Sequence, residues 1–93
     1  MSKWDKTIDG IRLNLTCGAC PEQYDAFLGE RLVGYLRLRH GGFTVECPTC
    51  DGELVYASEP DGDGSFTPEE RSTELTKAVH AIKDWLRKEA DRG

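Results

Sequence analysis

The chain has 93 residues, of which 38% are hydrophobic and 31% are charged, and this length predicts one small domain with a single core. Its net charge of −5 disfavours nonspecific binding to nucleic acid or to an anionic membrane. The amino end has no apolar run of signal-peptide length, and no stretch approaches the roughly 20 apolar residues of a membrane span. We therefore expect a cytoplasmic domain, residues 1–93, without membrane contact.

The first 57 residues alternate apolar and polar positions with the two-residue period of half-buried β-strands. Turn-forming residues, such as Gly29-Glu30 and Gly41-Gly42, separate the alternating segments. The pattern predicts five strands, of which the second is the weakest, at residues 11–16, 22–28, 31–39, 43–47 and 53–57.

The period changes after a polar, acidic and glycine-rich loop at residues 58–66. Thr67 and Glu70 have the spacing of a capping box and Pro68 suits the first helical turn, so a helix is predicted at residues 67–90. Its apolar residues recur at steps of three and four and form one stripe: Leu75, Ala78, Val79, Ile82, Trp85, Leu86 and Ala90. Because the stripe must pack on the sheet, we expect an α+β fold, an antiparallel β-meander of four to five strands with one C-terminal α-helix packed on one face.

The four cysteines form two Cys-x-x-Cys pairs, Cys17 with Cys20 and Cys47 with Cys50, which are separated by 26 residues. Zinc prefers tetrahedral thiolate coordination, and a Cys-x-x-Cys turn at a strand end directs two sulfurs at one point. In a reducing cytosol such pairs are metal ligands or redox centres more often than disulfides. The pattern predicts one closed zinc site with four cysteine ligands, and the alternative is a set of buried thiols or a redox pair.

The turn CPTCDG, residues 47–52, resembles the knuckles of zinc ribbons and rubredoxins, although Asp51 stands where those families usually have glycine. The first pair, TCGACP, departs further because Pro21 has no backbone N–H to donate toward a sulfur. The resemblance covers only the two turns. It implies zinc or, in a rubredoxin-like electron carrier, iron.

Residues 59–70, EPDGDGSFTPEE, resemble an EF-hand calcium loop. A strand rather than a helix is predicted to precede this loop, and the alternative is a solvated Asp-Gly turn followed by a helix cap. The residues that match the calcium-ligand places of the family are Glu59, Asp61, Asp63, Thr67 and Glu70.

The predicted strand at residues 31–39 supplies a candidate binding surface. Alternation places its leucines on the helix side, and it places Val33, Tyr35, Arg37 and Arg39 on the other side, with Gly34 as a bulge or bend. Such a face could bind an acidic partner or a phosphate backbone, the alternative being arginines that pair with acidic residues across strands. The predicted partner-binding face consists of Arg12, Arg31, Tyr35, Arg37 and Arg39.

No catalytic constellation stands out in the sequence, because His40 and His80 are expected at the surface and have no evident serine or cysteine partner. We therefore expect a non-catalytic zinc-binding domain that acts as a protein-interaction or regulatory module with an unknown protein partner. The alternatives are a nucleic-acid-binding zinc ribbon and a rubredoxin-like electron carrier. The segment from Gln23 to Val45 also resembles small uncharacterised proteins of actinobacteria and their phages, which implies an accessory protein and no particular activity.

Overall fold

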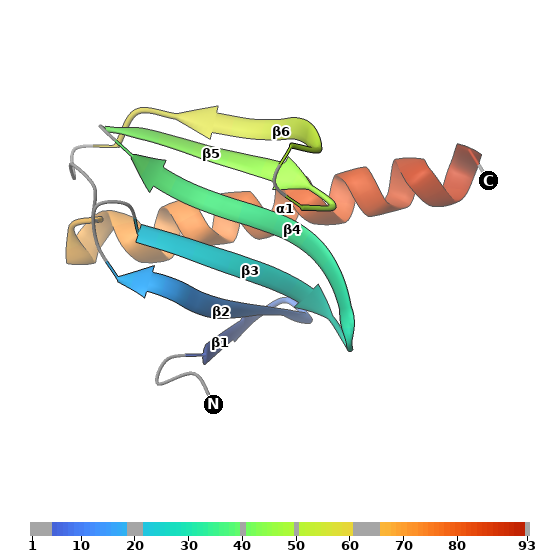
Figure 1. The fold of residues 1–93 in the computed structure, drawn as a ribbon, viewed down its shortest axis with the longest axis horizontal. Helices are drawn as coiled ribbons and strands as arrows, with labels where there is room; N and C mark the ends of the chain where they lie inside the picture. Colours follow the sequence, from blue (N-terminus) through green and yellow to red (C-terminus); the bar gives the residue numbers. More distant parts are fainter. Residues whose placement is uncertain (1–4, 19–21, 40, 50, 61–65, 93) are drawn as a thin grey trace.

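The computed structural model describes residues 5–18, 22–39, 41–49, 51–60 and 66–92, which form one antiparallel sheet and one helix (Figure 1). The strands follow one another in the sheet in chain order, so each strand pairs only with its neighbours in the sequence. The elements are β1 Asp5–Ile8, β2 Ile11–Gly18, β3 Glu22–Leu28, β4 Arg31–Arg39, β5 Gly42–Cys47, β6 Glu53–Ser58 and α1 Pro68–Arg92.

The predicted α+β class and C-terminal helix are confirmed, but the sheet has six strands rather than four to five. The additional strand, β1, is only four residues long and has a single apolar residue, Ile8, so it lacks a clear alternating pattern. It pairs with β2 through a two-residue turn in which Asp9 and Gly10 have φ angles of 50° and 87°. Asp-Gly is a strong sequence signal for this type of hairpin turn, and this signal could have revealed the strand.

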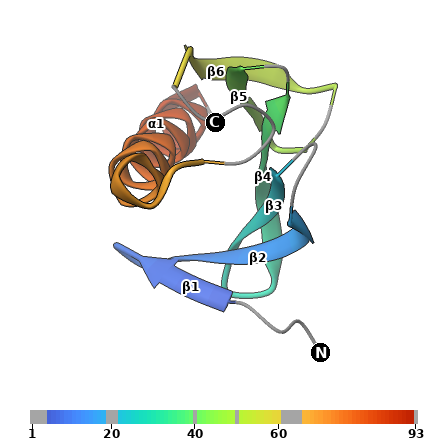
Figure 2. The ribbon, with the colours of Figure 1, turned by 90° about the vertical axis from the view of Figure 1, so that its left-hand side faces the viewer.

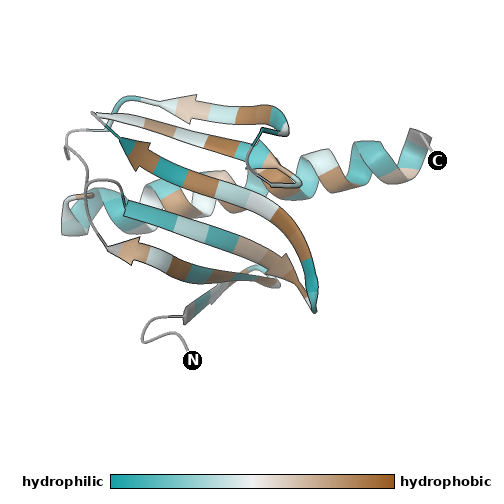
Figure 3. Ribbon diagram, viewed as in Figure 1, coloured by the Kyte–Doolittle hydropathy of each residue, from teal (hydrophilic) through white to brown (hydrophobic). Residues whose placement is uncertain are grey.

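The sheet curls around α1, which lies on its concave side (Figure 2). Along the strands, hydrophobic and hydrophilic residues alternate (Figure 3), so one face of each strand faces the helix and the other faces outward. Each large apolar side chain buried in this way contributes roughly 1.5–3 kcal/mol. The fully buried core includes Ile11, Leu13, Tyr24, Leu36, Leu38, Phe43, Val45, Leu75, Val79 and Ile82.

The start of α1 has the predicted capping box. The backbone N–H of Thr67 donates to Oε1 of Glu70 at 2.8 Å, and the backbone N–H of Glu70 donates to Oγ1 of Thr67 at 3.4 Å. The predicted apolar stripe is buried along the middle of the helix, whereas Trp85 and Leu86 are half-buried and Ala90 is exposed. The burial of the helix therefore decreases toward its C-terminal end.

A bulge in β4 changes the predicted alternation. Ala26 of β3 pairs with Gly34, and Phe27 pairs with Leu32, so Val33 is the extra residue of the bulge. Val33 is fully buried, and the prediction that it faces outward is wrong for this reason. A Cβ atom at Gly34 would lie 2.8 Å from Cδ1 of Ile82, so the absence of a side chain allows α1 to approach the sheet closely.

Candidate functional site

The two described cysteines of the predicted zinc site lie at opposite ends of the sheet. Cys17 is at the end of β2 and Cys47 is at the end of β5, and these two strands run in opposite directions because the sheet is an antiparallel meander (Figure 1). Cys17 is in β2, three strands away from β5, so ordinary strand spacing alone separates the two cysteines by roughly 14 Å across the sheet. Zinc–sulfur bonds are about 2.3 Å long, so one ion cannot bind both cysteines in this arrangement.

The other two predicted ligands, Cys20 and Cys50, lie outside the described residues. Within the part of the chain that the structure describes, no three His, Cys, Asp or Glu side chains are grouped so that they could hold a metal ion. The structure thus does not bring Cys17 and Cys47 together, and metal binding by either pair stays a prediction.

The turn after Cys47 is tight. The backbone N–H of Gly52 donates to the carbonyl of Thr49 at 3.0 Å, and a Cβ atom at Gly52 would clash with the carbonyl oxygen of Cys47. Asp51 has a φ angle of 69°, the left-handed conformation that glycine adopts more easily. Burial, together with the nearby carboxylates of Glu53 and Glu89, raises the pKa of the Cys47 thiol to about 12, so this thiol is protonated at neutral pH.

The calcium prediction is partly outside the described residues, because these exclude Asp61 and Asp63. Thr67 and Glu70 form the capping box, and Glu59 is exposed just after β6. The helix-cap alternative accounts for Thr67 and Glu70, and the strand β6 precedes the loop as expected. Calcium binding stays a prediction.

The convex face of the sheet carries four of the five residues predicted to form a partner-binding face. The guanidinium carbon of Arg12 lies 4.6 Å from the ring centroid of Phe27, which is a cation–π contact. The hydroxyl of Tyr35 donates to Oε1 of Gln23 at 2.8 Å. Residues that alternate with buried neighbours, and so share this face, are Arg12, Tyr35, Arg37 and Arg39.

Acidic residues interrupt this face. Asp25 and Glu46 are the register partners of Tyr35 on its two sides, and partial burial raises the pKa of Asp25 above its ordinary value. Arg31 does not join the face, because its Nη2 lies 2.7 Å from Oε1 of Glu89 on α1. The convex face is therefore a mixed surface rather than a continuous basic one.

Of the two histidines, His80 lies in the described residues. The side chain of His80 is 61% exposed, and its Nε2 lies 3.9 Å from a carboxylate oxygen of Asp9, so the predicted surface position is confirmed. His40 lies outside the described residues. Asp9 also accepts a hydrogen bond from Lys83 at 2.9 Å, which ties the β1–β2 turn to α1.

A buried carboxylate joins β3 to the start of α1, and the sequence patterns did not indicate it. Glu22 is only 2% exposed, and Nε of Arg71 lies 3.0 Å from its Oε2, while Nη2 of Arg71 lies 3.1 Å from its Oε1. The backbone N–H of Phe66 donates to Oε1 at 2.9 Å, and the hydroxyl of Tyr24 donates to Oε2. The Phe66 ring packs edge-on against Phe43, with centroids 4.9 Å apart.

The titration behaviour of this network follows from its contacts. Burial alone would raise the pKa of Glu22, but the hydrogen bonds from Arg71, Tyr24 and Phe66 outweigh it and lower this pKa below its ordinary value. Burial and the hydrogen bond to Glu22 raise the pKa of Tyr24. Every polar group of this network has a partner, which is typical of a structural anchor and not of a reactive site.

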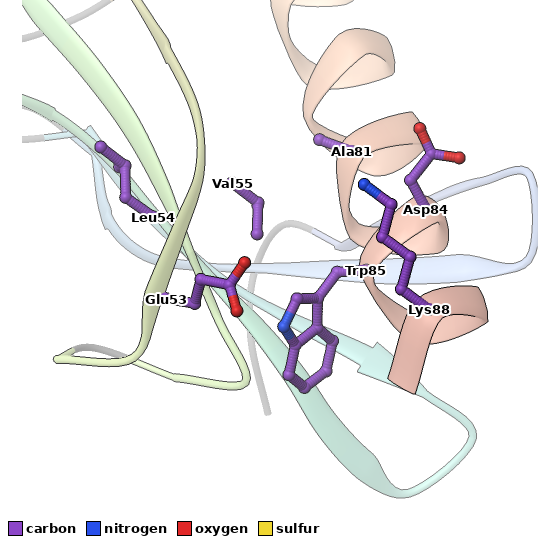
Figure 4. Close-up of a pocket in the computed structure, with 7 residues that line it drawn as sticks. All are labelled: Glu53, Leu54, Val55, Ala81, Asp84, Trp85 and Lys88. Atoms are coloured by element: carbon purple, nitrogen blue, oxygen red, sulfur yellow. The ribbon is translucent and has the colours of Figure 1, made fainter. Parts of the chain in front are cut away.

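Within the described residues, an open groove lies between β6 and the C-terminal half of α1 (Figure 4), and we call it the β6–α1 groove. Glu53 and Val55 point from β6 toward the helix, Leu54 points away, and the Trp85 ring lies between the two walls. The cavity has a volume of about 230 Å³, and its lining residues are Glu53, Leu54, Val55, Ala81, Asp84, Trp85 and Lys88.

A second cavity, of about 290 Å³, continues the groove toward the turn that follows Cys47. Both cavities share Glu53, Trp85 and Lys88, so these three residues lie where the cavities meet. The second cavity adds Glu89 from the helix and Pro48 and Gly52 from the turn. The sequence pattern places Trp85 in the apolar stripe of the helix. The pattern does not indicate that the sheet leaves the Trp85 side chain partly uncovered.

No known family model matches this chain, and neither any curated protein nor any solved structure matches it. None of the helical residues described forms a span that is long and apolar enough to cross a membrane.

Proposed function

We propose that this chain is a small non-catalytic protein-interaction module that binds an extended segment of a partner protein in the β6–α1 groove. The observation that carries the proposal is a groove that runs beside the last strand of the sheet, which pairs with β5 alone among the described strands. Proteins use such an edge to add a peptide as a further strand, in which backbone hydrogen bonds give affinity and side-chain pockets give specificity.

The two edges of the sheet differ in a way that favours β6. The other edge strand, β1, has four residues, includes the exposed Lys6, and is continued by a turn that Lys83 ties to the helix. Short and charged edge strands are typical of edges that resist pairing. In contrast, β6 has six residues, includes the 57% exposed Leu54, and lies next to an open cavity.

Trp85 supports the same site. Its ring is half-buried, packs against the core and is shared by both cavities of the groove. Tryptophan is among the residues that contribute most to binding energy at protein interfaces, where it forms the centre of a pocket. A peptide strand on β6 would cover the exposed part of this ring.

The convex face supports a nucleic-acid partner less well. Asp25 and Glu46 flank Tyr35 within this face, and the chain has a net charge of −5. Both facts oppose the approach of a phosphate backbone. The test of the groove therefore uses a peptide as the probe.

The test is a selection of 12-residue peptides from a random phage-displayed library on the purified chain. Selected peptides should bind Ala81→Arg at least tenfold more weakly than the original chain, because the new side chain fills the groove from the helix wall. Thr73→Arg, which adds the same side chain at an exposed helical position, is the matched control and should leave the affinity unchanged. A selection without specific binders, or binders that Ala81→Arg does not affect, would overturn the proposal.

A further inference from the structure

We infer, on the basis that the β6–α1 groove is a peptide site, that its ligand is an extended segment carrying an arginine or lysine side chain. The cationic group of this side chain is placed on the Trp85 ring, between Glu53 of β6 and Glu89 of α1. The shape of the groove alone does not specify the charge of the ligand side chain.

The position of the carboxylates supports this ligand. Glu53 of β6 and Glu89 of α1 both line the second cavity, together with Trp85 and the buried Cys47. Figure 4 shows the Glu53 carboxylate and the Trp85 ring in the space between β6 and α1, and both residues line the same two cavities. A cationic group that enters from the β6 side would meet an aromatic ring and the Glu53 carboxylate, with Glu89, which Arg31 already pairs, on the helix side.

The ion pairs of the groove leave one carboxylate available. Glu89 is paired with Arg31, whereas Glu53 has no ion-pair partner among the described residues. Lys88 is the one basic residue of the described lining, and it comes from the helix wall, where its side chain is exposed. The second cavity therefore contains two carboxylates and one ammonium group, in a chain whose net charge is −5.

The groove should select a cationic side chain because binding removes water from the Glu53 carboxylate, which costs free energy. A peptide strand on β6 removes water from this carboxylate, and a carboxylate without a partner is costly to desolvate. An arginine or lysine in the ligand supplies the partner and also stacks on the indole ring, which binds cations more strongly than other aromatic rings. An apolar side chain supplies neither, so the groove discriminates against it.

The experiment uses the peptides selected from the random library. We expect the groove-binding peptides to share an arginine or lysine at one position, and replacing it with the neutral citrulline or norleucine should weaken binding about tenfold. Glu53→Gln should weaken binding to a similar extent, and Trp85→Leu should do so by about fivefold because it keeps an apolar side chain but removes the ring. Glu69→Gln, which changes the net charge equally at an exposed position on α1, is the control and should have little effect.

The outcomes separate the two proposals. Peptides that Ala81→Arg excludes, but that carry an apolar residue and bind Glu53→Gln normally, would overturn the cationic ligand and leave the peptide groove in place. A stable dimer of the purified chain that Ala81→Arg converts to monomer would assign the groove to a second copy and overturn the inference. Loss of binding in Glu53→Gln and in the citrulline peptide, with normal binding by Glu69→Gln, is the result expected.

Discussion

The first turn of α1 is tied to β3 through the buried carboxylate of Glu22, whereas the C-terminal half of the helix is tied to the sheet by two exposed ion pairs. At the first end, Arg71, Tyr24 and Phe66 all donate to Glu22. At the other end, Lys83 pairs with Asp9 and Arg31 pairs with Glu89, and all four side chains are 42–56% exposed.

The difference separates the anchor of the fold from its open surface. A buried network is costly to break, because removing one member leaves the others without partners. Exposed ion pairs contribute little and allow the groove beside them to stay open to solvent. The buried anchor thus lies at the start of α1, and the proposed binding surface lies near its C-terminal half.

The largest effect should come from removing the buried carboxylate. Glu22→Ala should lower the free energy of unfolding by about 3 kcal/mol, because Arg71, Tyr24 and the Phe66 backbone lose their common acceptor. Urea denaturation measures the change, with the exposed Glu69→Ala as the matched control from the first turn of α1. If Glu22→Ala lowers the free energy of unfolding by less than about 1 kcal/mol, the start of α1 is anchored no more strongly than its C-terminal half.

The Glu22 carboxylate should also make the free energy of unfolding depend on pH, with a smaller effect than the loss of its side chain. Since the folded state lowers the pKa of Glu22 below its ordinary value of 4.5, the carboxylate contributes its full stability above this pH. The contribution is lost as the pH falls below 4.5 and through the folded-state pKa. Unfolding measured between pH 7 and pH 3 should therefore be less pH-dependent for Glu22→Gln than for the original chain, and identical slopes would show that Glu22 is not the responsible group.

The exposed ion pairs should have smaller effects. Arg31→Ala and Lys83→Ala should each change the free energy of unfolding by less than about 1 kcal/mol, because exposed pairs gain little over their hydration. The change should shrink further in 1 M salt, which screens such pairs. Denaturation of both variants at low and high salt measures this, and a loss comparable to that of Glu22→Ala would mean that both ends of α1 are anchored equally.

The two cysteine pairs should behave independently. The register places Cys17 and Cys47 at opposite ends of the sheet, so the effects of Cys17→Ser/Cys20→Ser and Cys47→Ser/Cys50→Ser on stability should add within about 0.5 kcal/mol in the fourfold variant. Elemental analysis of each variant gives the matching metal content. One closed site would instead lose its metal completely in either double variant and would show strong non-additivity.

Much of the fold could be predicted from local patterns. Alternation predicted five of the six strands, and the capping box and apolar stripe predicted α1. Gly34 was predicted as a bulge or bend, and the bulge lies beside it at Val33, but alternation alone did not reveal that the bulge turns Val33 into the core. Whether the two cysteine pairs lie at the same end of the sheet depends on the directions of the four successive strands from β2 to β5. The spacing of 26 residues between the pairs does not reveal these directions.

The candidate site was harder to predict than the strands and the helix, because it depends on how distant segments pack together. Glu22 reads as a surface residue at the start of a strand, and only the return of α1 over the sheet buries it beside Arg71. Trp85 reads as part of the helix stripe, and only the arrangement of β6 relative to α1 leaves a groove over it. Both features arise from contacts between segments that are distant in the sequence.

Hydrogen exchange of the chain with and without a selected peptide tests the central claim most directly. Strand addition at the β6 edge should slow the exchange of amides in Glu53–Ser58, and it should leave the amides of Asp5–Ile8 in β1 unchanged. Protection confined to β1, or to the strands that present Arg37 and Arg39 on the convex face, would contradict the assignment of the β6–α1 groove as the binding site.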